Sequence, residues 1–334
     1  MTDTRDDIPS VVERMRPVKV DAAVVDVHFV GDAAAFVLGE EALVLAREAE
    51  ERRIGVHGGA ILATAADDSR IVTGGDDSKV MATDASGASV EIAADSKHRW
   101  IDHVAIGPAG SVAWSAGKTA FVRTDKGDEH VLDVPSTVGA LAFLPKGFRL
   151  AIAHYGGATL WFPSVKAEPE RLAWKGSHLA ATISPDGRFV VTGMQEPSLH
   201  GWRLADRKDM RMQGYSARVR SLDWSADGKW LVTSGSTQVI LWPFQSKDGP
   251  MGKTPQLLAP AEQHVELVAC HPHQAVVAAG YADGLILLVR IEDGAEVLAR
   301  KPGDAPVTAL AWSHDGKMLA FGTEDGSAGV IDLG

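Results

Sequence analysis

The 334-residue sequence contains no asparagine and only one cysteine, Cys270. Without asparagine, tight turns must be built mainly from aspartate and glycine. A single cysteine excludes an internal disulfide, which agrees with a reducing compartment. The chain also lacks a run of the roughly 18 apolar residues that span a bilayer, and its N-terminus lacks the apolar segment of a secretory signal. We therefore expect a cytoplasmic protein that does not associate with membranes.

Basic residues are in deficit as well. The 33 Lys and Arg residues are outnumbered by 44 Asp and Glu residues, which gives a net charge of -11 at pH 7. No cluster of Lys and Arg stands out along the chain, although proteins that bind nucleic acid neutralise phosphates with such clusters. We therefore expect no nucleic-acid binding. The 45% apolar fraction and the 34 glycines fit a folded chain rich in turns.

One stretch, Ser221–Phe244, contains three strand-sized apolar runs separated by two turn signals, Asp227-Gly228 and Ser234-Gly235-Ser236. These runs predict a three-stranded antiparallel meander with two apolar faces. Copies of the unit recur at a spacing of roughly forty residues, as repeat architectures require. The third residue of the first run is found at Phe29, Thr64, Ile106, Phe143, Ile183, Trp224, Cys270 and Trp312.

A period near forty residues with four strands per unit is typical of a β-propeller, in which radial stacking buries both faces of every sheet. Ile183–Gly193, Trp224–Gly235 and Trp312–Gly326 resemble degenerate, bacterial-type WD40 repeats, in which an apolar pair precedes Ser-Pro-Asp-Gly, a strand and a glycine. The resemblance covers about residues 18–333, although the sequence has no Trp-Asp or Gly-His pair. It implies an all-β, single-domain propeller of four-stranded antiparallel blades.

Eight units and one spare N-terminal strand predict eight blades, with seven as the alternative. The eighth unit lacks an outer strand because the chain stops soon after its third strand. We expect Val18–Val20 to supply this strand by pairing with Ala328–Asp332. The predicted organisation is a flexible tail over residues 1–16 and a monomeric propeller over residues 17–334.

Two segments depart from the repeat. Residues 47–53, REAEERR, have the composition of a solvated turn of helix or loop. Residues 245–255, QSKDGPMGKTP, form the longest insertion and predict a protruding loop.

The motifs that suggest catalysis are incomplete. Ala116–Thr119 imitates the end of a phosphate-binding loop, but the glycine required upstream is replaced by Val112. Gly214-Tyr215-Ser216 begins like a nucleophile elbow and continues with Ala217 instead of completing it. We predict no catalytic residue, no cofactor and no enzymatic activity.

Histidines provide the candidate metal ligands. In Cys270–His273, adjacent residues of a strand point to opposite faces, which favours a structural role. His57, His103, His178 and His264 fall near the starts of first strands, which converge on the axis of a propeller. They could meet at the channel mouth and hold a metal, zinc among them, although ordinary loop histidines are the favoured interpretation.

The WD40 resemblance implies that residues before the first strand, and those between the second and third strands, line one face around the channel. On that face we place five candidate partner-binding residues, Trp100, Tyr155, Arg218, His264 and Tyr281. Aromatic and Arg residues are enriched at interface hot spots. The favoured function is a non-catalytic scaffold that binds a protein through this face. The alternative is a propeller that handles a ligand or metal with its channel-mouth histidines.

Tryptophans at repeat positions are expected to pack between blades instead of binding a partner. These are Trp202, Trp224, Trp242 and Trp312.

Overall fold

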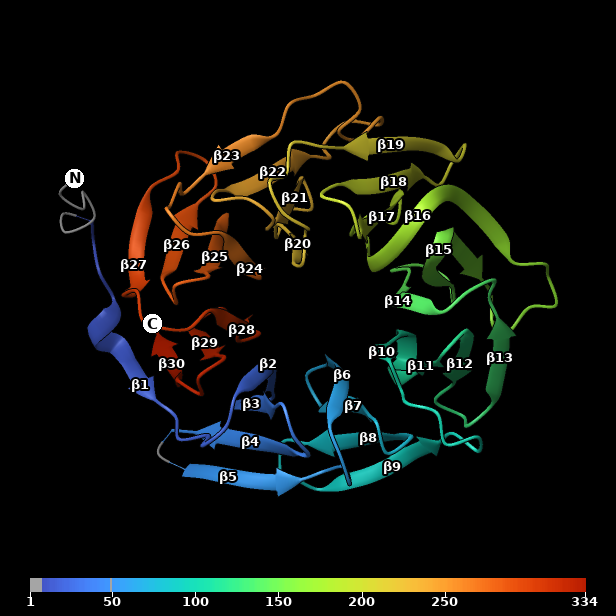
Figure 1. The fold of residues 1–334 in the computed structure, drawn as a ribbon, viewed down its shortest axis with the longest axis horizontal. Helices are drawn as coiled ribbons and strands as arrows, with labels where there is room; N and C mark the ends of the chain where they lie inside the picture. The colour runs from blue at the N-terminus through green and yellow to red at the C-terminus, as the bar shows by residue number, and fades with distance from the viewer. Residues whose placement is uncertain (1–7, 49) are drawn as a thin grey trace.

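In the computed structural model, which describes residues 8–48 and 50–334, the sheets stand around a central axis and each extends from an inner rim to the perimeter (Figure 1). The all-β propeller architecture is confirmed. Two single turns of 3-10 helix, η2 (Val12–Arg14) and η3 (Pro108–Gly110), are the helices of the described residues. Neither is long and apolar enough to cross a membrane.

Within the described residues, six sheets have four antiparallel strands each. From the inner rim outward they contain β2 (Val24–Val30), β3 (Ala33–Leu38), β4 (Ala42–Arg47) and β5 (Glu50–Gly55); β6 (Ile61–Ala66), β7 (Arg70–Gly75), β8 (Lys79–Asp84) and β9 (Ser89–Ala94); β10 (His103–Ile106), β11 (Val112–Ala116), β12 (Thr119–Arg123) and β13 (Glu129–Asp133); β20 (Leu222–Trp224), β21 (Trp230–Thr233), β22 (Val239–Pro243) and β23 (Gln256–Leu258); β24 (Val265–Cys270), β25 (Val276–Tyr281), β26 (Ile286–Arg290) and β27 (Glu296–Arg300); and β28 (Val307–Trp312), β29 (Met318–Thr323), β30 (Ala328–Asp332) and β1 (Met15–Pro17).

A further sheet has six strands and corrects the predicted blade number. The Arg149 guanidinium before β15 lies 4.8 Å from the Phe162 ring after it, so the chain must turn back within β15. The turn falls at Gly156-Gly157, where both residues have a positive φ. Tyr155 pairs with Ser177, which joins the fourth and fifth sequence units into one sheet. The prediction of eight blades is therefore wrong, since the described strands form seven hydrogen-bonded sheets. The six strands are β14 (Val138–Phe143), β15 (Leu150–Trp161), β16 (Glu170–Ile183), β17 (Phe189–Met194), β18 (Leu199–Arg203) and β19 (Lys208–Met212).

The hairpin turns show how aspartate and serine replace asparagine. The Ser184 hydroxyl donates to Asp186 Oδ1 at 2.7 Å and accepts the Phe189 amide at 2.9 Å. Gly187 adopts a φ of +77°, a left-handed conformation that glycine tolerates. The same Ser-to-Asp bond recurs at Ser225–Asp227 and Ser313–Asp315, each at 2.7 Å.

These turns lie on one face of the ring. Turns of neighbouring sheets touch there: the Gly31 amide donates to the Asp68 carbonyl at 2.8 Å, and His271 Nε2 donates to the Gly316 carbonyl at 3.1 Å. We call this the hairpin face. Because successive strands are antiparallel, the opposite face carries the loops that lead into the inner strands and the turns between second and third strands. We call it the mouth face.

The last sheet is completed by the N-terminus. β1 pairs with β30 in a register that sets Met15 opposite Ile331 and Pro17 opposite Gly329. The ladder lies just upstream of the predicted segment 18–20, and the Val18 amide extends it by donating to the Ala328 carbonyl at 2.9 Å. The reason is packing, since Val18 and Val20 are buried in a core shared with β2 and β4.

The segment before β1 also corrects the predicted tail. The Leu298 amide of β27 donates to the Pro9 carbonyl at 2.8 Å, and the Val11 amide donates to the Leu298 carbonyl at 2.9 Å. Residues 9–17 therefore fasten two adjacent sheets. The rest of the predicted tail, residues 1–7, lies outside the described residues.

In the charged run, the described residues 47, 48 and 50–53 are not helical. Arg47 ends β4 and Glu50 begins β5, in which Arg53 pairs with Val44. Charged side chains suit this outer strand because it is the exposed edge of its sheet.

Trp224, Trp242 and Trp312 lie between neighbouring sheets as predicted, whereas Trp202 packs within the six-stranded sheet, between its β15–β16 and β17–β18 parts. Trp202 and Trp242 are buried. The indole of Trp242 donates to the Tyr215 hydroxyl at 2.8 Å, which in turn lies 3.0 Å from Thr233 Oγ1. The half-buried Trp224 reaches across to the next sheet and donates to Thr182 Oγ1 at 2.8 Å. The Trp224 and Trp242 rings therefore each contribute both apolar contact and a satisfied polar group.

Deleting residues 1–17 should destabilise the ring, because the edge of β30 loses its partner and β27 loses its tie. Backbone hydrogen bonds contribute about 1 kcal/mol each, so we expect the melting temperature to fall by roughly 5 °C or more. Deleting residues 1–7 is the control, since it leaves every interaction described here in place. Calorimetry of the three chains measures the effect, and equal melting temperatures would show that the N-terminus does not hold the ring closed.

Candidate functional site

Two hollows lie where the inner strands begin. One, of ≈ 500 Å³, is lined by the starts of β2, β6 and β10. The other, of ≈ 570 Å³, is lined by β2, β24 and β28 together with Arg220. Val25 lines both hollows. The inner rim of the mouth face is therefore the concave part of this surface.

A β-bulge recurs at the start of the inner strands and positions the rim residues. In the described residues, six inner strands shift register by one residue at the same point. A bulged residue is left unpaired, and its side chain is redirected. The bulged residues are Val25, Leu62, Gly139, Leu179, Glu266 and Thr308.

Large apolar side chains are exposed at this face. Val25, Leu62 and Leu179 come from bulges, whereas Trp100 and Tyr155 come from loops, and their exposed fractions range from 40% to 61%. These five are half of the ten large apolar residues that the described part of the chain exposes. We call them the mouth patch. Exposed apolar side chains of this size are candidates for contacts with a partner.

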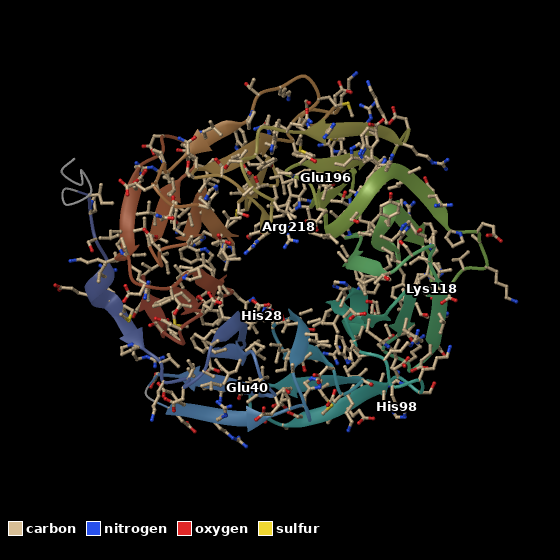
Figure 2. The ribbon with its side chains drawn as sticks, viewed as in Figure 1. His28, Glu40, His98, Lys118, Glu196 and Arg218 are labelled. Atoms are coloured by element: carbon tan, nitrogen blue, oxygen red, sulfur yellow. The ribbon has the colours of Figure 1, made fainter. Side chains whose placement is uncertain are left out.

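Charged and polar groups accompany the mouth patch. Arg218 is exposed at the inner rim of the ring (Figure 2), and it has no ion-pair partner among the described residues. Arg220 pairs with Glu266 at 3.2 Å, and His264 Nε2 lies 3.1 Å from the Ser216 hydroxyl. The rim thus offers both apolar area and groups that can form directed hydrogen bonds.

Four of the five predicted partner-binding residues are accessible, but they do not form one cluster. Trp100 precedes β10, Tyr155 lies within β15, and Arg218 precedes β20, so they are distributed along the rim. Tyr281 was placed wrongly, because it is fully buried at the end of β25 and its hydroxyl donates to the Ala259 carbonyl at 2.6 Å. Sequence reasoning missed the bulged residues. Their signal in the sequence is a pair of adjacent apolar residues, as in Ile61-Leu62, which interrupts the alternation of apolar and polar residues along the strand.

Further along the inner strands lies a hydrogen-bonded group of Asp26, His28 and Thr64. His28 Nε2 is 3.1 Å from Asp26 Oδ2 and 2.9 Å from Thr64 Oγ1. Burial raises the pKa of Asp26, but the charge of His28 and hydrogen bonds from His28, Thr64 and Val27 outweigh it and lower this pKa. Burial lowers the pKa of His28, but the charge of Asp26 and its hydrogen bond outweigh this effect, so the pKa of His28 is raised. Asp26 and His28 therefore each favour the charged form of the other.

Asp223 and Cys270 face each other from adjacent inner strands. The Asp223 carboxylate accepts the Cys270 amide at 2.6 Å and the Trp224 amide at 2.8 Å. Burial nevertheless raises the pKa of Asp223 to about 6. Burial, followed by Asp223, also raises the pKa of the Cys270 thiol. The thiol is therefore protonated and a poor nucleophile at neutral pH.

The four histidines proposed as metal ligands are engaged separately. His57 contacts Asp77 at 2.9 Å and Thr73 at 2.8 Å. The Nε2 atom of His103 lies 3.2 Å from the Val138 carbonyl, and His178 contacts Thr192 at 2.7 Å. Among the described residues, no three His, Cys, Asp or Glu side chains are placed to hold a metal ion.

His200 on β18 is an unusual buried histidine. Its ring stacks on Trp174 with centroids 3.9 Å apart, and neither ring nitrogen has a hydrogen-bond partner among the described residues. The Asp209 carboxylate lies 3.6 Å from Nε2, which is too far for a hydrogen bond, and it is half-exposed and screened by water. Burial, followed by His178 and Arg211, lowers the pKa of His200 to about 3.

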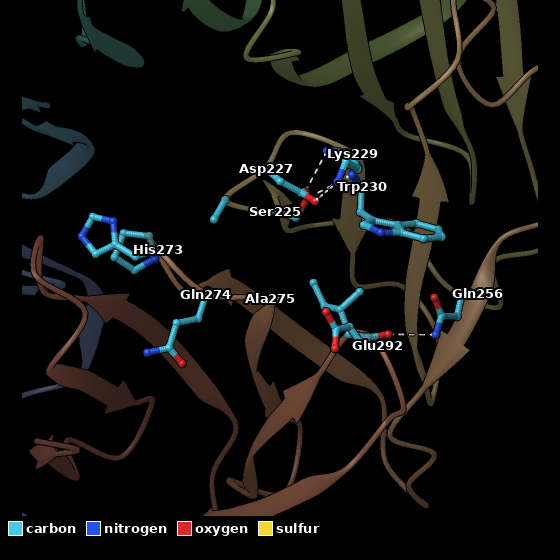
Figure 3. Close-up of a pocket in the computed structure, with 12 residues that line it drawn as sticks. Ser225, Asp227, Lys229, Trp230, Gln256, His273, Gln274, Ala275 and Glu292 are labelled. Carbon is cyan, nitrogen blue, oxygen red and sulfur yellow. Dashed lines mark hydrogen bonds and ion pairs between the residues drawn. The ribbon is translucent and has the colours of Figure 1, made fainter.

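A pocket between the sheets of β20–β23 and β24–β27 contains Ser225, Asp227 and His273 (Figure 3), residue types that can form a catalytic triad. Their geometry is different. The Ser225 hydroxyl donates directly to Asp227 at 2.7 Å, and His273 Nε2 donates to the His314 carbonyl at 2.8 Å. The serine therefore lacks a base, and these groups stabilise turns.

Two family models match parts of the chain. The model described as Anaphase-promoting complex subunit 4 WD40 domain matches residues 268–334, and the model described as WD domain, G-beta repeat matches residues 208–243. Together they fall on four of the later sequence units. The first three units, in which the sequence motifs are weakest, are not covered by these two matches.

Curated relatives and a solved structure extend this similarity. WD repeat-containing protein 55 of Rattus norvegicus is 27% identical over 212 residues, 61% of this chain and 53% of that protein. Autophagy-related protein 16 of Arabidopsis thaliana is 27% identical over 151 residues, 44% of this chain and 29% of that protein. The chain therefore spans about half the length of the first of these relatives and less than a third of the second. The computationally designed Ika8 protein, at 19% identity, superposes with a TM-score of 0.77 over 94% of this chain and 97% of its own, which shows the fold alone.

Replacing His200 by Phe should stabilise the protein, increasingly so at lower pH. Unfolded wild-type chain protonates His200 below its ordinary pKa of 6.5, whereas the folded ring stays neutral down to about 3, so stability is lost as the pH falls through this window. The gain in unfolding free energy should grow from about 1 kcal/mol at pH 8 to about 3 kcal/mol at pH 5. Urea unfolding at both pH values measures it, with His130→Phe on β13 as control. A gain that does not change with pH would contradict this assignment.

Proposed function

Because the chain belongs to the WD40-repeat family, we propose that it is a non-catalytic scaffold that binds a partner protein through its mouth face. One observation carries the proposal: half of the exposed large apolar side chains of the described residues lie on this face, and two of them, Val25 and Leu62, line its hollows. Trp100, Tyr155 and Arg218 belong to the residue types that dominate the energy of protein interfaces.

The backbone supports such a role because the rim is rigid. Each inner strand is hydrogen-bonded within its sheet and packed against neighbouring sheets, so the bulged side chains keep fixed relative positions. A preorganised surface binds with a smaller entropic cost than one that must be ordered on binding. The exposed Val25, Leu62 and Leu179 would then supply the apolar centre of an interface, and Arg220 with Glu266 part of its polar rim.

A double substitution tests the mouth face. Trp100→Ala with Arg218→Glu removes an exposed aromatic ring and reverses an unpaired charge, so the partner captured from the native host should be bound at least tenfold more weakly. The melting temperature should stay at the wild-type value because neither side chain is buried. Quantitative capture and calorimetry on the same preparations check both expectations.

Val131→Ala with Lys126→Glu is the matched control, since it makes the same kind of change on the exposed perimeter at β13. This control should retain the partner. By contrast, Trp242→Ala should lower stability by roughly 3–5 kcal/mol, because it opens a cavity between sheets. Loss of binding in the control, or full binding by the mouth-face variant, would show that the interface lies elsewhere.

A further inference from the structure

The hairpin face carries a hollow that shares no lining residue with the two hollows of the mouth face. It has a volume of ≈ 760 Å³ and lies across the fourth, fifth and sixth sequence units. Its walls are the β14–β15 turn, Gly187-Arg188 just before β17, the segment Arg203–Asp206 at the end of β18, and Lys247-Asp248. We call it the hairpin-face groove.

The insertion over residues 245–255 builds one wall of this groove. It was expected to protrude, but it is held against the fifth unit. Arg188 donates to the Ser246 carbonyl at 3.1 Å and to the Phe244 carbonyl at 3.3 Å, and Arg203 pairs with Asp248. The longest departure from the repeat therefore has a defined position, and its result is a walled groove.

The floor of the groove is apolar. Leu144 is buried there and Leu204 is half-buried, whereas 39% of Phe162 is exposed. The Arg149 guanidinium lies over the Phe162 ring, 4.8 Å from its centroid. A cation on one face of this ring leaves its remaining surface available to a side chain from outside.

The charge of the groove is opposite to that of the whole protein. Five basic residues line it against two acidic ones, Asp206 and Asp248, although the chain carries a net charge of -11. Lys146 and Lys247 are exposed, and neither has an ion-pair partner among the described residues. The three arginines of the groove are paired with carboxylates, Arg149 with Glu170, Arg188 with Asp186, and Arg203 with Asp206 and Asp248. The two exposed lysines therefore supply the positive charge that is left for a ligand.

We infer that the hairpin-face groove binds an acidic segment of another protein. Its carboxylates pair with Lys146 and Lys247, and an aromatic or aliphatic side chain packs on Phe162. Nucleic acid fits this chemistry less well, because only two basic residues of the groove lack an ion-pair partner among the described residues, too few to neutralise a continuous line of phosphates. This site is additional to the mouth face and does not depend on the function proposed for it.

A random copolymer of glutamate and tyrosine, labelled with a fluorophore, is the probe, and anisotropy at low salt is the measurement. The wild-type chain should bind it at least tenfold more tightly than it binds polyglutamate, which lacks the aromatic ring. Lys146→Glu with Lys247→Glu should weaken copolymer binding at least tenfold. Phe162→Ala should bring the affinity for the copolymer down toward that for polyglutamate. Lys126→Glu with Lys301→Glu, which makes the same charge change on exposed residues outside the groove, should bind like the wild type.

Three outcomes would overturn the inference. These are no copolymer binding by the folded wild-type chain, equal weakening by the groove and control substitutions, and tighter binding of a single-stranded oligonucleotide than of the copolymer. Trp100→Ala with Arg218→Glu should bind the copolymer normally. A failure of the groove and a failure of the mouth face therefore give different results.

Discussion

Every sheet of this ring has two apolar faces, and only the neighbouring sheets can cover them. The constraint is clearest where the chain closes. Val24 and Phe36 of the first sheet share one core with Ala320 and Val330 of the last. Burial of this kind is the main favourable term in folding, so the first and last sheets must stay together. Strand β1, which completes the last sheet although it begins the chain, satisfies this requirement.

Closure of the ring fixes the backbone of the rim and leaves the side chains there free to vary. The same bulge presents Leu62 on one strand, Glu266 on another and Gly139 on a third. Glycine is required at the third, because a Cβ at Gly139 would clash with the His178 carbonyl. The bulge therefore separates the two tasks of an inner strand. Its paired residues maintain the sheet, whereas its unpaired residue sets the chemistry of the mouth.

The period, the strands and the turn chemistry were predictable because they depend on local alternation and on Asp-Gly hairpins. Features that depend on contacts between units were not. Tyr155 and Tyr281 were both predicted to lie between a second and a third strand, yet Tyr155 is exposed within β15 and Tyr281 is buried at the end of β25 with its hydroxyl on Ala259. Sheet continuity between Tyr155 and Ser177 likewise depends on a tertiary pairing. The hairpin-face groove could not be predicted from the sequence either, because its two lysines, Lys146 and Lys247, come from different sequence units.

The polar groups whose residue types are those of catalytic sites are already paired within this fold. Asp26, His28 and Thr64 satisfy each other, and the Ser225 hydroxyl is committed to its own turn. Catalysis instead requires a base and a nucleophile in contact and open to a substrate. Two sets of exposed side chains lack such partners among the described residues. These are the apolar residues of the mouth face and the positively charged lysines of the hairpin-face groove. Since these two surfaces lie on opposite faces of one rigid ring, two ligands could occupy them without contact, which is the geometry that a scaffold requires.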